Sequence, residues 1–257
     1  AALATDISQL VSCVFILRFL SKSREMYRVQ LRKIRFYDHL LSRILKIGLP
    51  TGVQSIVISL SNILVQSSIN SFGATVMASY AAFNKIDGII LLPIMSISMA
   101  ATTFCGQNFG ACEVERVKKG MKTSVGMGTL YAIAAGAVML IFGPYIIRIF
   151  TGEQAVIENG IYMMNLMYPF YWTLAIMNIT IGAIRGTGRT MEGMVVSIFS
   201  LCVCRVIWIF AALRISHRLS LLILGYPITW IIGAVIMLVY IKRGRWLRVE
   251  ELEERSL

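Results

Sequence analysis

Seven long apolar stretches constrain this chain more than any other feature of its sequence. They run over residues 1–20, 47–72, 76–105, 123–150, 156–184, 191–213 and 219–241. Each holds the ~20 residues that an α-helix needs to cross about 30 Å of hydrocarbon. Only 15% of the residues are charged, and these lie mainly in the gaps between the stretches. The sequence therefore predicts an all-α integral membrane protein with about seven transmembrane helices.

The net charge of +12 comes from basic residues that cluster in alternate gaps. Residues 18–46, 106–122, 185–189 and 242–257 are rich in Lys and Arg, whereas residues 71–75, 151–155 and 214–218 form short gaps with few charges. Because basic loops stay on the cytoplasmic side, we expect these loops and the C-terminus to be cytoplasmic. The basic residues do not alternate with aromatic ones in patches, so membrane lipid is the expected partner and nucleic acid is not.

The apolar stretches carry no group of residues that would support catalysis or metal binding. His39 and His217 lie in separate hydrophilic gaps, and the five cysteines form no Cys-x-x-Cys pair. No Gly-x-x-x-x-Gly-Lys-Ser/Thr phosphate-binding loop occurs. We therefore expect neither enzyme activity nor a bound metal or cofactor.

Proline occurs in or at the start of several apolar stretches, among them as Pro50, Pro93, Pro169 and Pro227. Because proline lacks a backbone N–H and clashes with the preceding turn, these positions predict bent helices. Such bends can serve as hinges in transporters or can be plain kinks, and the sequence leaves both interpretations open.

Two glycine-rich segments follow the third and fifth apolar stretches. They read Gly106-Gln107-Asn108-Phe109-Gly110-Ala111 and Arg185-Gly186-Thr187-Gly188-Arg189-Thr190. We interpret both as transitions from helix to turn. In this interpretation Gly110 or Gly186 adopts positive φ, and Gln107, Asn108 or Thr190 caps free backbone groups.

Together with Gly48-Leu49-Pro50, and with Ala81-Ala82-Phe83-Asn84-Lys85-Ile86-Asp87 leading to Leu92-Pro93, these segments resemble the multidrug and toxic compound extrusion (MATE) transporters. The resemblance covers nearly the whole chain and implies the second half of a twelve-helix protein. Residues 1–21 would be the last helix of a missing N-terminal half, which would be a partner of this chain. Residues 22–46 would form a basic cytoplasmic linker, residues 47–242 a six-helix bundle, and residues 243–257 a cytoplasmic tail.

The resemblance also implies a function. The protein would be a secondary active antiporter of the bacterial plasma membrane that exports amphipathic or cationic small molecules in exchange for Na⁺ or H⁺, by alternating access. Some sodium-coupled members of the family have acids in the seventh and tenth helices. The nearest positions here, Ile58 and residues 174–178, hold none. Two alternatives remain: a lipid-linked oligosaccharide flippase of the same superfamily, and a seven-helix receptor, which the span count alone suggests.

Polar residues in the second apolar stretch form one stripe. On a helix they fall within an arc of roughly 80°, and they are Ser55, Ser59, Asn62, Gln66 and Asn70. Because amides and hydroxyls facing lipid are unfavourable, the stripe should face the bundle interior or a water-filled cavity. It is a candidate lining for a substrate cavity, and interhelical hydrogen bonding is the alternative.

Three ionisable residues lie well inside the apolar stretches, namely Lys85, Asp87 and Arg205. Counted from the ends of their helices, Asp87 and Arg205 lie at similar depths, so we expect them to form an ion pair. The pair could be structural or could serve as a proton relay.

Aromatic residues of the fifth apolar stretch are further candidates for substrate contact. Tyr168 and Trp172 share one side of the helix with Asn165, and Tyr171 shares another with Asn178. The aromatic residues could receive a flat or cationic compound. Many aromatic residues in membranes only fill space or anchor the helix at the interface, so packing is the alternative.

Overall fold

The computed structural model describes residues 2–23, 28–29, 35, 38–216, 218–244 and 246–247. All regular secondary structure in these residues is helical. Seven helices there are long and apolar enough to cross a membrane, over Leu3–Lys22, Ile44–Asn70, Ala74–Gly110, Val114–Ile147, Gln154–Gly186, Thr190–Ile215 and Leu219–Lys242. The prediction of an all-α membrane protein with seven spans is therefore confirmed.

The chain divides into two units, Ala1–Lys46 and Ile47–Leu257. The first contains α1 (Ala2–Lys22) and the beginning of α2 (Asp38–Asn70). Large apolar side chains of α1, such as Leu10 and Phe15, are exposed. An exposed apolar surface of this kind is expected for a helix surrounded by lipid tails or by other membrane helices.

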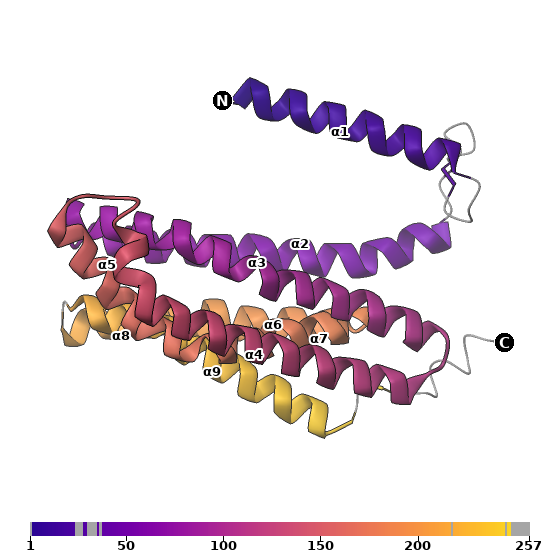
Figure 1. Cartoon of the computed structure of the whole chain (residues 1–257). Helices are drawn as coiled ribbons and strands as arrows, with labels where there is room; N and C mark the ends of the chain where they lie inside the picture. The colour runs from indigo at the N-terminus through magenta and orange to yellow at the C-terminus, as the bar shows by residue number, and fades with distance from the viewer. Residues whose placement is uncertain are drawn as a thin grey trace. The chain divides into compact units, whose positions relative to one another are not determined.

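The second unit contains the remainder of α2 and the helices that follow. These are α3 (Ala74–Gly110), α4 (Val114–Ile147), α5 (Gln154–Met167), η2 (Tyr168–Phe170), α6 (Tyr171–Gly186), α7 (Thr190–Ile198), η3 (Phe199–Cys204), α8 (Arg205–Ile215) and α9 (Leu219–Lys242). Figure 1 shows α3, α4, α6 and α9 running alongside one another. The span formed by α5, η2 and α6 is the most buried one, and it packs against α3, α4 and α9.

Two spans of the second unit change helix type part-way along. The fifth changes at η2, a 3₁₀ turn that contains Pro169, where the sequence predicts a bend. The sixth changes at η3, a π-helical segment over Phe199–Cys204 that ends next to Arg205. Single π turns within α-helices are frequent at functional sites. Pro50, Pro93 and Pro227 lie inside α2, α3 and α9, which continue through them.

The most extensive helix contact among the described residues joins α3 to α6, along a row of mostly small residues. Ser98 Oγ donates a hydrogen bond to the Asn178 carbonyl at 2.8 Å, and Thr102 Oγ1 donates one to the Gly182 carbonyl at 2.8 Å. A side chain at Gly186 would collide with the Thr102 carbonyl. Small residues let two membrane helices approach this closely. We call Ser98, Thr102 and Gly106, with Asn178, Gly182 and Gly186, the α3–α6 seam.

Candidate functional site

A cavity of about 520 Å³ lies within the second unit, where α2, α3, α6, α8 and α9 come together. Its lining combines one carboxylate, one guanidinium, several amides and a set of aromatic rings. The residues are Ile58, Asn62, Gln66, Tyr80, Phe83, Asn84, Asp87, Gly88, Leu91, Met95, Met167, Leu174, Asn178, Leu201, Arg205, Tyr226 and Trp230. We call it the Asp87 cavity. Its volume and mixed lining are typical of small-molecule sites.

Among the residues that the structure describes, Asp87 supplies the only carboxylate in this lining. Its Oδ1 atom is buried and has no hydrogen-bond partner among the described residues. An ionised carboxylate that is buried without a partner costs several kcal/mol or more. The Asp87 side chain as a whole is half-buried and borders the cavity, so a proton or a positively charged group in the cavity would stabilise its buried oxygen.

Arg205, on α8, is held in place by neighbouring helices. Its side chain is buried, Nη1 donates to Asn62 Oδ1 at 3.4 Å, and Nη2 donates to Thr229 Oγ1 at 3.2 Å. The guanidinium also lies 4.4 Å from the ring centroid of Tyr226, a cation–π contact. Tyr226 Oη is in turn 2.6 Å from Tyr80 Oη. Arg205 therefore joins α2, α8 and α9.

The expected ion pair between Asp87 and Arg205 does not form. In the described part of the chain, the ion pairs join Lys118 to Glu115 and Arg189 to Glu192. The guanidinium of Arg205 instead contacts Asn62, Thr229 and the Tyr226 ring, and its Nε atom is buried without a partner among the described residues. Both residues nevertheless line the same cavity, which agrees with the similar depths predicted for them.

Lys85, the third predicted intramembrane charge, is exposed and lies outside the lining of the cavity. It is two residues from Asp87, and residues two apart on a helix point in different directions. The prediction that these residues face different sides of their helix agrees with this placement.

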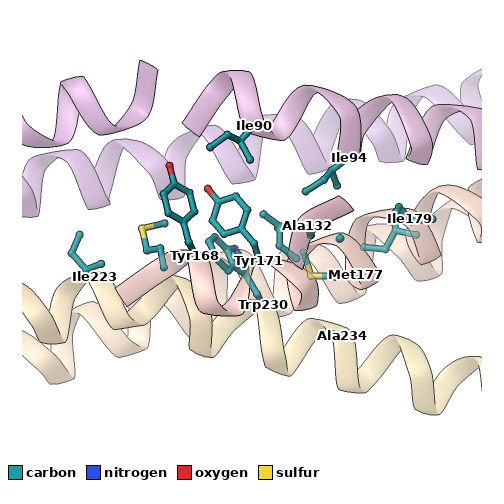
Figure 2. Packing of buried hydrophobic residues seen from close by; sticks show 14 of the residues in the cluster. Ile90, Ile94, Ala132, Tyr168, Tyr171, Met177, Ile179, Ile223, Trp230 and Ala234 are labelled. Carbon is teal, nitrogen blue, oxygen red and sulfur yellow. The ribbon is translucent and has the colours of Figure 1, made fainter. Parts of the chain in front are cut away.

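A row of aromatic rings leads from α3 to α9. Ring centroids are 5.8 Å apart for Phe83 and Tyr168, 4.9 Å for Tyr168 and Tyr171, 5.3 Å for Tyr171 and Trp230, and 5.9 Å for Trp230 and Tyr226. Figure 2 shows Tyr168 and Tyr171 projecting side by side, with Trp230 beside Tyr171. Phe83, Trp230 and Tyr226 line the cavity, and the buried rings of Tyr168 and Tyr171 pack against Phe83 and Trp230 respectively.

The sequence model of the MatE family matches residues 50–211, which is more than half of the chain. The chain belongs to the MatE family. The resemblance to MATE transporters, inferred from the glycine-rich motifs, is thereby confirmed.

Curated relatives of this MATE chain are named as multidrug resistance or export proteins. The probable multidrug resistance protein YpnP of Bacillus subtilis is 26% identical over 82% of the chain and 47% of its own length. The probable multidrug resistance protein NorM of Thermotoga maritima is 26% identical, over 96% and 53%. The multidrug export protein MepA of Staphylococcus aureus is 23% identical, over 77% and 44%. The chain thus spans about half the length of the curated relatives it matches.

Solved structures share the fold. A MOP superfamily transporter from Pyrococcus furiosus, described as having a binding pocket of reverse polarity, superposes with a TM-score of 0.87 at 21% identity, over 95% of this chain and 55% of that one. An outward-facing multidrug resistance MATE transporter superposes with a TM-score of 0.86 at 21% identity, over 97% and 56%. At this identity the likeness establishes the MATE fold.

The structure assigns the MATE motif glycines a role different from the predicted one. Positive φ occurs at Gly188 (84°) and Cys112 (61°), not at Gly110 or Gly186, which end α3 and α6. Gly186 is needed for close packing, because Gly106 of the other motif lies directly against it. Glycine at these two positions therefore joins the two motifs across the α3–α6 seam.

The polar residues of the motifs do not cap the helices as predicted. Asn108 Nδ2 donates to the Phe104 carbonyl one turn earlier, at 2.8 Å. Gln107 and Ala111 are exposed, and Thr190 Oγ1 is buried without a partner among the described residues. Arg185 reaches Gln54 on α2 at 3.3 Å, so it links two helices of the MATE bundle.

The predicted polar stripe of α2 divides into two parts. Asn62 and Gln66 line the Asp87 cavity, whereas Ser55, Ser59 and Asn70 do not. Ser55 Oγ donates within its own helix to the Thr51 carbonyl, and Asn70 Oδ1 accepts from Gln66 Nε2 at 3.0 Å. The stripe therefore contributes both to the cavity lining and to interhelical hydrogen bonding, because Asn62 Oδ1 also accepts a hydrogen bond from Arg205.

The predicted aromatic and amide candidates also divide. Asn178 lines the cavity, Tyr168 and Tyr171 are buried behind its wall, and Trp172 is 41% exposed and does not line it. Four aromatic residues of the lining were not predicted from the sequence, namely Tyr80, Phe83, Tyr226 and Trp230. A signal was present, since Tyr226 and Trp230 are four residues apart and therefore share a helix face.

Proposed function

We propose that the chain forms one half of a multidrug efflux transporter that exports amphipathic or cationic compounds in exchange for Na⁺ or H⁺. The observation that carries this proposal is the Asp87 cavity, in which a carboxylate oxygen without a partner lies among aromatic rings. Membership of the MatE family and the names of its curated relatives support the same activity.

The lining supplies both kinds of contact that such compounds need. Asp87 offers a negative charge, while Phe83, Tyr226 and Trp230 offer ring faces to flat or cationic groups. Arg205 contacts Asn62, Thr229 and Tyr226, so it helps to hold the shape of the site. The amides of Gln66, Asn84 and Asn178 would contribute polar contacts.

The exchange of a compound for an ion can result from competition between the two for the negative charge of Asp87. A proton or Na⁺ that neutralises Asp87 weakens the attraction for a cationic compound, and a bound compound disfavours the ion in the same measure. Because binding of one excludes the other, the site suits antiport when it opens to the two sides in turn. The structure of the site is compatible with either ion.

The domain arrangement belongs to the same proposal. Residues 47–242 would form one six-helix bundle, residues 1–21 the last helix of the other bundle, and residues 22–46 the linker between them. Basic loops would lie in the cytoplasm of a cell whose plasma membrane holds the transporter. A flippase for lipid-linked oligosaccharides is less well supported, because among the described residues Arg205 is the one cation in the lining.

A transport assay of the full-length protein that contains this chain tests the proposal. In inverted membrane vesicles from a host that lacks its own pumps, uptake of ethidium should begin when an H⁺ or a Na⁺ gradient is imposed and stop when that gradient collapses. Asp87→Asn should abolish uptake, whereas Lys85→Gln, a charge change on the side of α3 away from the cavity, should leave it unchanged. Equal uptake with and without a gradient would rule out antiport.

A further inference from the structure

A second hollow lies between α3 and α4, apart from the Asp87 cavity. It measures about 430 Å³ and is lined by Ala100, Phe104, Arg116, Lys119, Gly120, Thr123 and Ser124. None of these residues lines the Asp87 cavity. We call it the α3–α4 groove.

Close packing of the two helices produces the apolar part of the groove. The Phe104 ring lies against Gly120, where any side chain would collide with it. Phe104 is nevertheless 38% exposed, so part of its surface faces the groove. Val117 and Met121 are buried in the bundle, and this rotation of α4 leaves Arg116 and Lys119 exposed beside the ring.

The groove lies at the depth where lipid headgroups are expected. Exposed apolar residues of α4 extend from Met127 to Tyr145, a rise of about 27 Å at ~1.5 Å per residue. That length matches the ~30 Å of the hydrocarbon layer. Thr123 and Ser124 lie about one turn beyond Met127, and the two basic residues follow within two further turns. The polar part of the groove therefore adjoins the end of the apolar band.

The charge of the groove is positive. Two cations and two hydroxyls line it, and the described lining holds no carboxylate, although Glu115 lies within electrostatic reach of Lys119. The acid nearest in sequence, Glu115, forms an ion pair with Lys118, whose Nζ lies 2.7 Å from Glu115 Oε1. A phosphate group would meet two cations and two hydroxyls here, while an acyl chain would meet Ala100 and Phe104.

We propose that the α3–α4 groove binds an anionic phospholipid. The headgroup phosphate is bound by Arg116 and Lys119, with Thr123 and Ser124 as hydrogen-bond donors, and an acyl chain lies along Ala100 and Phe104. Basic pockets between membrane helices at the cytoplasmic surface bind such headgroups. The proposal does not depend on transport activity, since none of its residues contacts the Asp87 cavity.

Native mass spectrometry of the delipidated full-length protein tests the proposal, with dioleoyl phosphatidylglycerol as the probe. Saturable binding of the anionic lipid is expected, and dioleoyl phosphatidylcholine should bind more weakly. The double variant Arg116→Gln/Lys119→Gln should weaken this binding about 30-fold, which corresponds to about 1 kcal/mol for each basic residue. Phe104→Ala should weaken it by a smaller factor.

The matched control is Lys118→Gln/Lys122→Gln, which removes the same charge from the same helix outside the groove. This control also releases Glu115 from its ion pair, so retained binding in it is a stringent result. Equal loss in both double variants would show general attraction to a basic surface and would overturn the proposal. Complete competition by millimolar inorganic phosphate would also overturn it, because a lipid that contacts Phe104 should not be displaced by phosphate alone.

Discussion

One face of α3 runs from the Asp87 cavity to the α3–α6 seam, and the two regions differ in how completely their polar groups are paired. In the cavity, Asp87 Oδ1 has no partner among the described residues. In the seam, Ser98 and Thr102 each donate to a carbonyl of α6. Asn178 belongs to both, because its side chain lines the cavity and its carbonyl accepts from Ser98. This difference suggests that one segment of α3 and α6 stabilises the bundle and that another segment of the same two helices forms the binding site.

The largest effect is expected from a methyl group in the seam. Gly186→Ala places Cβ against the Thr102 carbonyl, which is backbone and cannot rotate away. We expect a loss of about 3 kcal/mol in stability, the upper part of the range for overpacking, or a Tm about 6–12 °C lower. Gly110→Ala in the other motif meets nothing within 4 Å and serves as the control. Thermal unfolding of the two purified variants measures the difference, and equal Tm values would contradict the packing role.

The opposite result is expected in the cavity. Asp87→Asn removes a half-buried charge whose Oδ1 atom has no partner among the described residues, so the Tm should be unchanged or higher while gradient-driven transport falls at least tenfold. Transport by this variant should be compared with that of Lys85→Gln in the same vesicles. A parallel fall in Tm and in transport would show that Asp87 is structural, and the contrast between the two regions would then disappear.

A smaller effect is expected from a single seam hydroxyl. Ser98→Ala removes the bond to the Asn178 carbonyl and should cost about 1 kcal/mol, near the values measured for interhelical bonds in membranes. Ser96→Ala is a matched control, because Ser96 Oγ donates only within its own helix, to the Leu92 carbonyl. Chemical unfolding curves of both variants give the difference directly.

The smallest effect concerns the support of Arg205. Tyr226→Phe keeps the ring below the guanidinium but removes the contact with Tyr80 Oη, so stability should fall by about 0.5–1 kcal/mol. Tyr226→Leu removes the ring as well and should cost about 1 kcal/mol more. If both variants unfold at the same midpoint, the cation–π contact contributes nothing measurable.

Hydropathy was sufficient to locate the spans, since each predicted stretch coincides with a helix to within a few residues at most ends. The exceptions are the start of α2, predicted at residue 47 and observed at Asp38, and the start of α4, predicted at Thr123 and observed at Val114. The first turns of α4 carry Arg116, Lys118, Lys119 and Lys122, and a hydropathy window excludes such residues even where they are helical. A helix that extends beyond the hydrocarbon layer cannot be recognised from apolar content alone.

The site was predicted less completely, because depth and face do not determine which groups make contact. The predicted partners Asp87 and Arg205 share a cavity, but the partners of Arg205 come from α2 and α9, which lie far from it in sequence. The sequence could not show that Gly188 rather than Gly186 adopts positive φ, since either glycine permits it. Trp246 was assigned to the tail, yet it is 2% exposed and belongs to the core.

The π-helical segment η3 sets the direction in which Arg205 points. A π turn holds one more residue than the α turn it replaces, and one residue corresponds to about 100° of rotation around a helix. Counting straight through from Thr190 with α-helical spacing would thus assign Arg205 to another side of its span. Deleting one residue from Phe199–Cys204 would turn the rest of the span by about that angle and carry the guanidinium away from Thr229 and Asn62. The length of this short segment is therefore as much a part of the site as the arginine itself.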